Sequence, residues 1–198
     1  MYKGLKNRKG FTLIELLAAI VILGVLMMVA IPAMTRYIAN SKKDVFMNTA
    51  KQYISSVRYA ILSDGFLCEG SDSPFDCGLS DLTNSYTRII VPASIVELDS
   101  SSGTNSPWGK PFATKENNNA WIIVYNNGSS EEPSYEYYFI GTDTAGNGFS
   151  DASLEANMKR SKVKTGGTIP TLDDVKKEFC SADEGGVTPT CYVVDSYN

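Results

Sequence analysis

The sequence contains no histidine among its 198 residues. This absence excludes Ser-His-Asp and Cys-His nucleophile systems, zinc sites with histidine ligands, and the side chain that most often acts as a general base near pH 7. Aspartate, glutamate, lysine and tyrosine are present, but their spacing matches no recognisable catalytic arrangement. The sequence therefore points to no catalytic residue.

Basic charge is scarce outside the first ten residues. The chain has a formal net charge of −4, and residues 1–10 contribute Lys3, Lys6, Arg8 and Lys9 without any acidic residue. The remainder carries 14 basic and 22 acidic residues. Proteins that bind nucleic acids need a basic face for the phosphate backbone, so this acidic remainder argues against a nucleic-acid partner.

Cysteine is also rare, with four residues at spacings that do not fit paired C-x-x-C metal knuckles. Three disulfide pairings are possible. We favour Cys68 with Cys77 and Cys180 with Cys191, because these pairs close loops of only 8 and 10 intervening residues. Such bonds form by default outside the cytoplasm, whereas a cytosolic protein would keep free thiols. The side of the membrane on which the cysteines lie therefore decides whether they form disulfides or stay free thiols.

One long apolar run dominates the N-terminal part of the chain. Residues 16–34 contain no charge, and adding residues 11–15 gives 24 residues with Glu15 as the single charge. At about 1.5 Å per residue, this length crosses a hydrocarbon core of about 30 Å. The basic residues before it keep residues 1–10 in the cytoplasm by the positive-inside tendency and send the rest outside.

Neither an ordinary secretory signal nor a plain membrane anchor explains all the features of this apolar run. The run is longer than a usual signal core, contains Glu15 and lacks a clean A-x-A cleavage site. A plain anchor accounts for the length, but not for Gly10-Phe11 at the boundary or for a carboxylate that costs at least about 2.5 kcal/mol at the centre of a membrane helix.

The segment GFTLIE, residues 10–15, resembles the prepilin cleavage and methylation motif of type IV pilins and type II secretion pseudopilins. The resemblance implies that a membrane peptidase cuts between Gly10 and Phe11 and that the new amine of Phe11 is N-methylated. Gly24 and Pro32 fall where this family often has residues that loosen the helix. The resemblance covers residues 6–35, about a sixth of the chain.

The resemblance gives Glu15 an assembly role. In a bundle of apolar helices, a lone carboxylate would be a buried charge in need of a partner. The available cation is the Phe11 amine of a neighbouring subunit, and this pairing would fix the axial register. The implied organisation is a cleaved leader at residues 1–10, a helix at 11–63 whose residues 11–34 form a transmembrane and assembly stem, and a globular head at 64–198.

The pattern after the apolar run predicts an α+β fold. Phe46, Ala50, Tyr53, Val57 and Ile61 recur with a period near 3.6, so one helix over residues 12–63 should pack a single face on the head. Pro32 should kink or loosen it, and Asp64-Gly65 should end it. The fold implied by the resemblance is the pilin fold, a long N-terminal helix packed on a small antiparallel sheet.

Several elements are expected in the head. Residues 121–125 and 135–140 are the strongest strand segments and should form an antiparallel hairpin. Pro92 indicates a broken or edge strand over 88–98, since proline cannot donate to a ladder. The remaining expectations are irregular loops at 65–85 and 100–109, short helices at 151–160 and 171–179, the latter opened by a capping box, and a last strand at 191–194.

Two further segments carry weaker signals. SPWGKPF, residues 106–112, resembles an Asp-Pro-Trp-Gly-x-Pro-aromatic segment of major pseudopilins, with Ser106 in place of Asp; it also fits a turn that packs Trp108 and Phe112. Asp143, Asn147 and Asp151 lie in a Gly-rich loop, placed like the calcium loop of major pseudopilins. The carboxylates are few and the spacing is not that of an EF-hand, so a solvated turn is favoured, and we expect no cofactor.

These observations lead to the expectation of a structural subunit and not an enzyme. It would polymerise with itself and with related minor pilins into a type IV pilus. Prepilin peptidase, an assembly platform and the cytoplasmic membrane would be its other partners, and the head would face outward before export to the surface filament. The alternatives are a type II secretion pseudopilin, favoured by the Trp108 segment, and an anchored extracellular domain that never assembles. Motility, adhesion, DNA uptake and secretion all remain open as its task.

Overall fold

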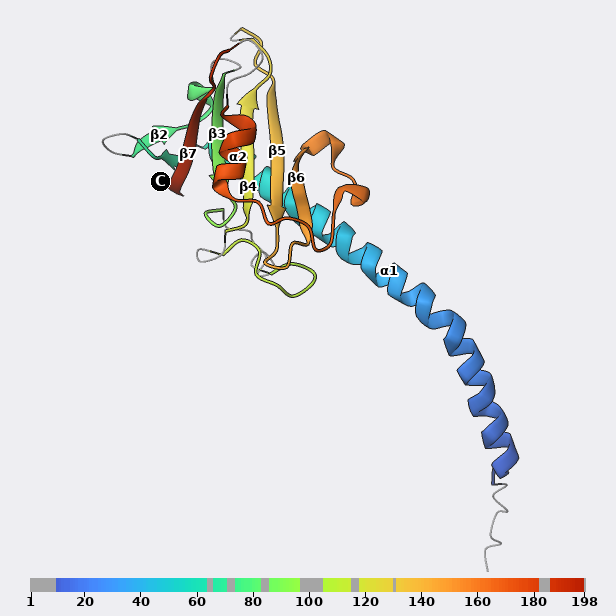
Figure 1. Ribbon diagram of the computed structural model, residues 1–198. Helices are drawn as coiled ribbons and strands as arrows, with labels where there is room; N and C mark the ends of the chain where they lie inside the picture. The colour runs from blue at the N-terminus through green and yellow to red at the C-terminus, as the bar shows by residue number, and fades with distance from the viewer. Residues whose placement is uncertain are drawn as a thin grey trace, which may run out of the picture. The chain divides into compact units, whose positions relative to one another are not determined.

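The computed structural model describes residues 10–63, 66–70, 74–82, 86–96, 105–114, 118–129, 131–181 and 186–197. The chain divides into two compact units, Met1–Ser41 and Lys42–Asn198. One helix, α1 (Leu13–Leu62), begins in the first unit and ends in the second (Figure 1). The second unit, called the head below, therefore includes the C-terminal part of α1.

The remaining elements all belong to the head. They are β1 (Phe66–Cys68), β2 (Phe75–Cys77), η1 (Leu79–Asp81), β3 (Thr87–Pro92), β4 (Ala120–Asn126), β5 (Tyr135–Thr142), β6 (Gly148–Leu154), η3 (Glu155–Asn157), η4 (Arg160–Lys162), α2 (Leu172–Phe179) and β7 (Thr190–Tyr197). Together they give an α+β fold that is consistent with the pilin fold.

The helix α1 has two parts with opposite exposure. Every residue from 10 to 41 is exposed. Beyond residue 41 one face is buried in the head, comprising Phe46, Ala50, Tyr53, Ile54, Val57, Ala60 and Ile61. The expected amphipathic half is thus confirmed, with its apolar stripe inward as a period of 3.6 requires. The expected helix end at Asp64-Gly65 lies outside the described residues.

The seven strands form one mixed sheet in the order β2-β1-β7-β3-β4-β5-β6. All neighbouring pairs are antiparallel except β3 and β7, which run parallel with Ile89 opposite Tyr192. The last strand of the chain therefore lies inside the sheet, between β1 and β3. An entirely antiparallel sheet was expected, and nothing in the local pattern of β7 could reveal a parallel neighbour about a hundred residues earlier.

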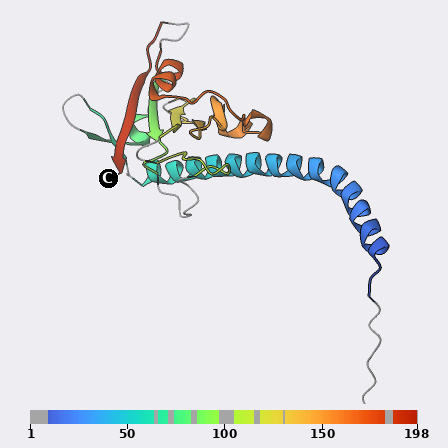
Figure 2. The same cartoon turned by 60° about the horizontal axis from the view of Figure 1, so that its bottom comes forward.

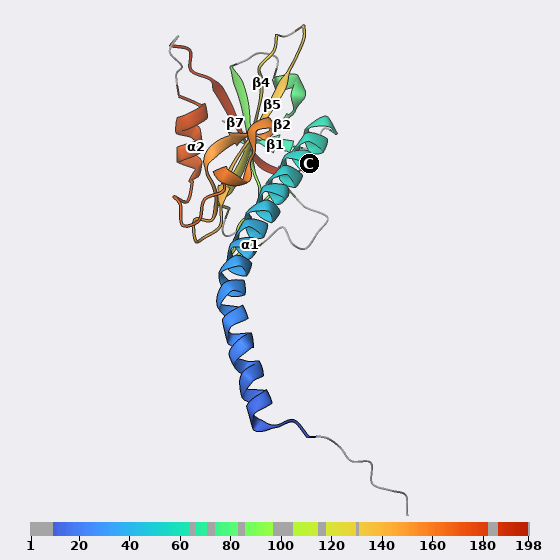
Figure 3. The same cartoon turned by 90° about the vertical axis from the view of Figure 1, so that its right-hand side faces the viewer.

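The two helices cover opposite faces of the sheet (Figure 3). Val124, Tyr137 and Phe139 face the buried stripe of α1 in the larger core. Ile123 and Ile140 lie on the other face with Val175 of α2. The alternation of side chains along β5 therefore divides its aromatic and apolar residues between two cores, as the strand pattern predicts.

Three expectations about the head were wrong in whole or in part. Residues 66–68 and 75–77 form a short hairpin, not an irregular loop, because β1 pairs with both β2 and β7. The segment at 88–98 is broken, which was one of the two alternatives, because β3 ends at Pro92 and a turn follows at residues 93–95. The edge alternative is wrong, since β3 lies between β7 and β4. Residues 148–154 form β6 in place of a helix, and only the turns η3 and η4 follow.

Other expectations about local structure are confirmed. The strands β4 and β5 pair as an antiparallel hairpin, with Ile122 opposite Phe139. The Thr171 hydroxyl accepts from the backbone N–H of Asp174, and the Asp174 carboxylate accepts from Thr171, so a capping box opens α2. These features depend on residues close in sequence, which makes them readable from local pattern.

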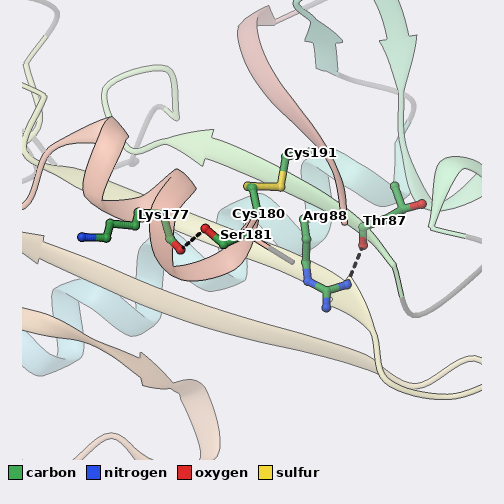
Figure 4. Close-up of a disulfide and its surroundings, with 6 residues drawn as sticks. All are labelled: Thr87, Arg88, Lys177, Cys180, Ser181 and Cys191. Carbon is green, nitrogen blue, oxygen red and sulfur yellow. Dashed lines mark hydrogen bonds between the residues drawn. A yellow bond between two sulfur atoms is a disulfide. The ribbon is translucent and has the colours of Figure 1, made fainter. Parts of the chain in front are cut away.

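Two disulfides join Cys68 to Cys77 and Cys180 to Cys191. The first crosses the β1–β2 hairpin at one edge of the sheet. The second ties the C-terminal end of α2 to the start of β7, and Figure 4 shows it beside Thr87 and Arg88 of β3. This is the local pairing that the short loops favour, and each bond links elements that the sheet also brings together.

Candidate functional site in the N-terminal segment

The N-terminal motif residues lie at the exposed start of α1. Gly10, Phe11 and Thr12 precede the helix, and the Phe11 side chain is 90% exposed. The peptide bond between Gly10 and Phe11 therefore lies in non-helical backbone. A protease that binds an extended substrate would meet no helical hydrogen bond at this position.

The Glu15 carboxylate has two hydrogen-bond donors within its own chain. The backbone N–H and the hydroxyl of Thr12 both donate to Glu15 Oε2, each at 2.9 Å. The Glu15 N–H donates in return to Thr12 Oγ1 at 3.3 Å. This reciprocal arrangement is a capping box, which begins the helix at Leu13 and satisfies donors that would otherwise lack partners.

Thr12 is the residue of this site that the sequence analysis missed. The signal was present in the sequence, because Thr12-x-x-Glu15 has the spacing of a capping box. From this spacing a capping box was predicted at the start of α2, but not at the start of α1. Glu15 consequently has a local role in starting the helix, in addition to the assembly role expected from the resemblance.

The apolar part of α1 presents side chains on all sides. The large exposed hydrophobic residues of this part include Leu13, Ile14, Leu16, Leu17, Ile20, Val21, Ile22, Leu23, Val25, Leu26, Met27, Met28, Val29, Ile31 and Met34. In length and composition, α1 is able to cross a membrane, and it is the one such helix among the described residues. An apolar surface of this size needs lipid or other protein as its surroundings.

Gly24 and Pro32 both lie inside the continuous helix. An added Cβ at Gly24 would meet no atom within 4 Å, so the glycine leaves space on the helix surface and not inside a packed contact. Pro32 has no N–H to donate to the preceding turn. The hydroxyl of Thr35 donates to the Pro32 carbonyl at 3.0 Å, which adds one local hydrogen bond after the proline.

The Trp108 segment forms a turn against α1. The Gly109 N–H donates to the Ser106 carbonyl at 2.8 Å, and Gly109 adopts a left-handed φ of 74°. The ring centroids of Trp108 and Phe112 lie 5.9 Å and 5.0 Å from that of Phe46. The expected turn is therefore present. Both aromatic residues pack on Phe46 of the helix, and Phe112 also lies 6.2 Å from Phe139 of β5.

The weak calcium candidates are engaged by protein groups. Asp143 is fully buried, and its carboxylate accepts from the Ser106 hydroxyl at 2.6 Å and from the backbone N–H groups of Ala145 and Asn147 at 2.9 Å each. The Asn147 amide N–H₂ also donates to both carboxylate oxygens. Asp151 instead pairs with Lys164 at 2.6 Å.

These contacts use oxygens that a bound cation would need. Asn147 presents its amide nitrogen to Asp143, while its oxygen accepts from the Gly166 N–H at 3.2 Å. Within the described ranges, no group of three or more acidic, cysteine or histidine side chains is placed to hold a metal ion. Protein donors satisfy the Asp143 carboxylate in this structure, and the Ser106 hydroxyl among them joins the loop at 105–111 to the loop at 143–147.

Comparison with known proteins bears on the N-terminal segment. Residues 5–31 match the family model of the prokaryotic N-terminal methylation motif. The chain is consistent with a type IV prepilin-like protein, and this motif, the apolar helix and the two disulfides fit such a protein together. No solved structure matches the chain.

Proposed function

We propose that this chain is a structural prepilin that is cut between Gly10 and Phe11, N-methylated at Phe11 and polymerised through its apolar helix into a type IV pilus. The observation that carries the proposal is that the methylation motif at residues 5–31 extends into the part of α1 before residue 42, where every apolar side chain is exposed. A helix with this surface requires surrounding lipid before assembly and surrounding copies afterwards.

Cleavage would create a cation beside the Glu15 carboxylate. In the uncut chain, the Thr12 N–H and hydroxyl both donate to Glu15 Oε2, so the carboxylate has hydrogen-bond donors at the start of the membrane span. In a filament, the Phe11 amine of a neighbouring copy would supply the opposite charge. Because an unpaired buried charge is strongly unfavourable, only one axial offset between neighbours would satisfy both groups.

The partners and location follow from this proposal. The motif implies pilin processing and assembly machinery in general, and the apolar helix fits a membrane anchor with an exposed head. We assign prepilin peptidase, an assembly platform, minor pilins and further copies of this chain as the specific partners. The head would lie outside the cytoplasmic membrane and then on the cell-surface filament, and the chain would have no enzymatic activity of its own.

A type II secretion pseudopilin is the second candidate. The Ser106–Phe112 stretch, with its turn at Gly109, is the observation that favours it. A surface filament that contains this chain would support the pilus, whereas a short fibre confined to the periplasm and needed for secretion would support the pseudopilus. A membrane-anchored domain that never assembles would give neither result.

Two substitutions at Glu15 separate its roles. Glu15→Ala removes both the cap and the charge, whereas Glu15→Gln keeps a side chain that serves in a capping box but carries no charge. We expect both variants to be inserted and cleaved, and both to lose most of the filament yield, measured by quantifying sheared filaments. Wild-type filament yield with Glu15→Gln would overturn the pairing with the Phe11 amine.

Gly10→Val tests the cleavage site. This variant should keep residues 1–10, which the intact mass of the protein would show.

A further inference from the structure

Basic residues gather in two segments of an otherwise acidic head. Residues 42–44 and 155–164 together contain six basic and two acidic residues, although the chain after residue 10 holds 14 basic and 22 acidic residues. Nearly half of the positive charge outside the leader therefore occurs in 13 residues. Such segregation of charge produces a local field that the net charge of −4 conceals.

Ion pairs hold these two segments side by side. Arg160 donates to Asp44 of α1 through Nε at 2.6 Å and through Nη2 at 2.5 Å. Arg58 of α1 pairs with Glu155 at 2.5 Å. The segment after β6 is consequently fixed alongside α1, as Figure 2 shows. In the sequence, Lys159 and Lys162 flank Arg160, and Lys42 and Lys43 precede Asp44.

We name Lys42, Lys43, Lys159, Arg160 and Lys162 the basic collar. The three ion pairs within the described residues use Arg58, Arg160 and Lys164, so none of the four collar lysines has a carboxylate partner there. Lys159 and Lys162 are exposed, and Lys42 and Lys43 are half-buried. Their positive charges are therefore available to an external anion.

We propose that the basic collar binds the anionic phospholipid head groups of the membrane in which α1 is anchored. Lys42 follows Met34, the last residue of the apolar run, by eight positions. Eight residues of α-helix rise about 12 Å, and the head-group region extends about 5–7 Å beyond the hydrocarbon core. A lysine side chain and a screening length of about 8 Å span the remaining distance.

The spread of the charges favours a lipid surface over a single bound ion. The collar lysines come from two separate segments, and Lys159 and Lys162 are exposed while Lys42 and Lys43 are half-buried, which suits a plane of phosphates better than an enclosed site. A basic residue close to an anionic membrane strengthens binding about fivefold. The collar would thus hold the head against the membrane before assembly and release it when α1 leaves the bilayer, so this inference rests on the membrane insertion in the proposed function.

The test uses the full chain in lipid nanodiscs. One set of discs contains neutral phosphatidylcholine, and the other contains about one-third phosphatidylglycerol. Backbone hydrogen exchange is followed over residues 157–164. We expect at least a fivefold slowing in the anionic discs, which disappears at about 0.5 M salt because the interaction is screened.

Matched double variants locate the effect. Lys159→Gln with Lys162→Gln should abolish the slowing, whereas Lys176→Gln with Lys177→Gln on α2 removes the same charge and should retain it. Equal exchange in both kinds of disc, or equal slowing in both variants, would overturn the inference. The same slowing produced in neutral discs by inorganic phosphate or by a short DNA duplex would overturn the lipid assignment. Failure of the wild-type chain to enter discs would instead count against the proposed membrane anchor.

Discussion

The exposed part of α1 and the head differ in how their side chains are buried and hydrogen-bonded. From Gly10 to Ser41 every residue is exposed, and the hydrogen bonds of Glu15 are local to its own first turn. In the head, Phe46, Phe112 and Phe139 are buried, and the Asp143 carboxylate has donors from two loops. The head is complete as a single chain, whereas the N-terminal part needs lipid or other copies. Function is therefore expected to concentrate where the single chain leaves surface unsatisfied.

The largest difference between the head and the exposed part of α1 is expected when one large side chain is removed from each. Phe46→Ala should lower the free energy of unfolding of the head by about 3–5 kcal/mol, because the ring is buried against three other aromatic residues. Thermal or denaturant unfolding of the detergent-solubilised full chain measures this loss.

Leu17→Ala is the matched control in the exposed part. Leu17 is exposed, so the melting temperature of the head should not change, while filament yield should fall. If Leu17→Ala destabilised the head as much as Phe46→Ala, the division into a complete head and an incomplete stem would be wrong.

The two disulfides should differ in what their removal disturbs. Each closes a short loop, so either Cys→Ala pair should cost about 2–3 kcal/mol. Loss of Cys180–Cys191 should also speed hydrogen exchange in β1 and β3, because both strands pair with β7. Loss of Cys68–Cys77 should affect chiefly the β1–β2 hairpin at the sheet edge. Identical exchange patterns in the two variants would contradict the interior position of β7.

A smaller effect is expected from the hydrogen bond between Ser106 and Asp143. Ser106→Ala removes one donor from a fully buried carboxylate, which should cost about 1–3 kcal/mol. Ser181→Ala, which removes an exposed hydroxyl bonded to the Lys177 carbonyl, is the control and should be nearly neutral. Calcium should not raise the melting temperature of either protein. A clear rise at millimolar calcium would show that the Asp143 loop takes a cation after all.

The smallest effect concerns the cap of α2 and depends on pH. The Thr171 hydroxyl and backbone N–H donate to Asp174 and hold the pKa of this exposed carboxyl below its usual range. The carboxylate therefore adds stability that is complete above about pH 4 and is lost as the pH falls through the lowered pKa. The difference in melting temperature between wild type and Asp174→Asn should vanish in acid. A difference that persists unchanged at low pH would exclude this linkage.

Local sequence pattern was sufficient for part of this structure. The buried stripe of α1, the β4–β5 hairpin and the capping box at Thr171 each depend on residues within a few positions of one another. The parallel pairing of β7 with β3 and the bond from Ser106 to Asp143 join residues far apart, and they could not be read from local periodicity. In the candidate site, Gly10, Phe11 and Glu15 were recognisable as a motif, whereas Thr12 was overlooked although its spacing to Glu15 was visible.

The mass of the N-terminal peptide from purified surface filaments is the decisive measurement for the proposed function. Filaments sheared from cells should contain this chain beginning at Phe11, with one methyl group on its amine. A filament-associated chain that retains residues 1–10, or filaments that lack the chain entirely, would contradict the proposal that it is processed and assembled as a pilin.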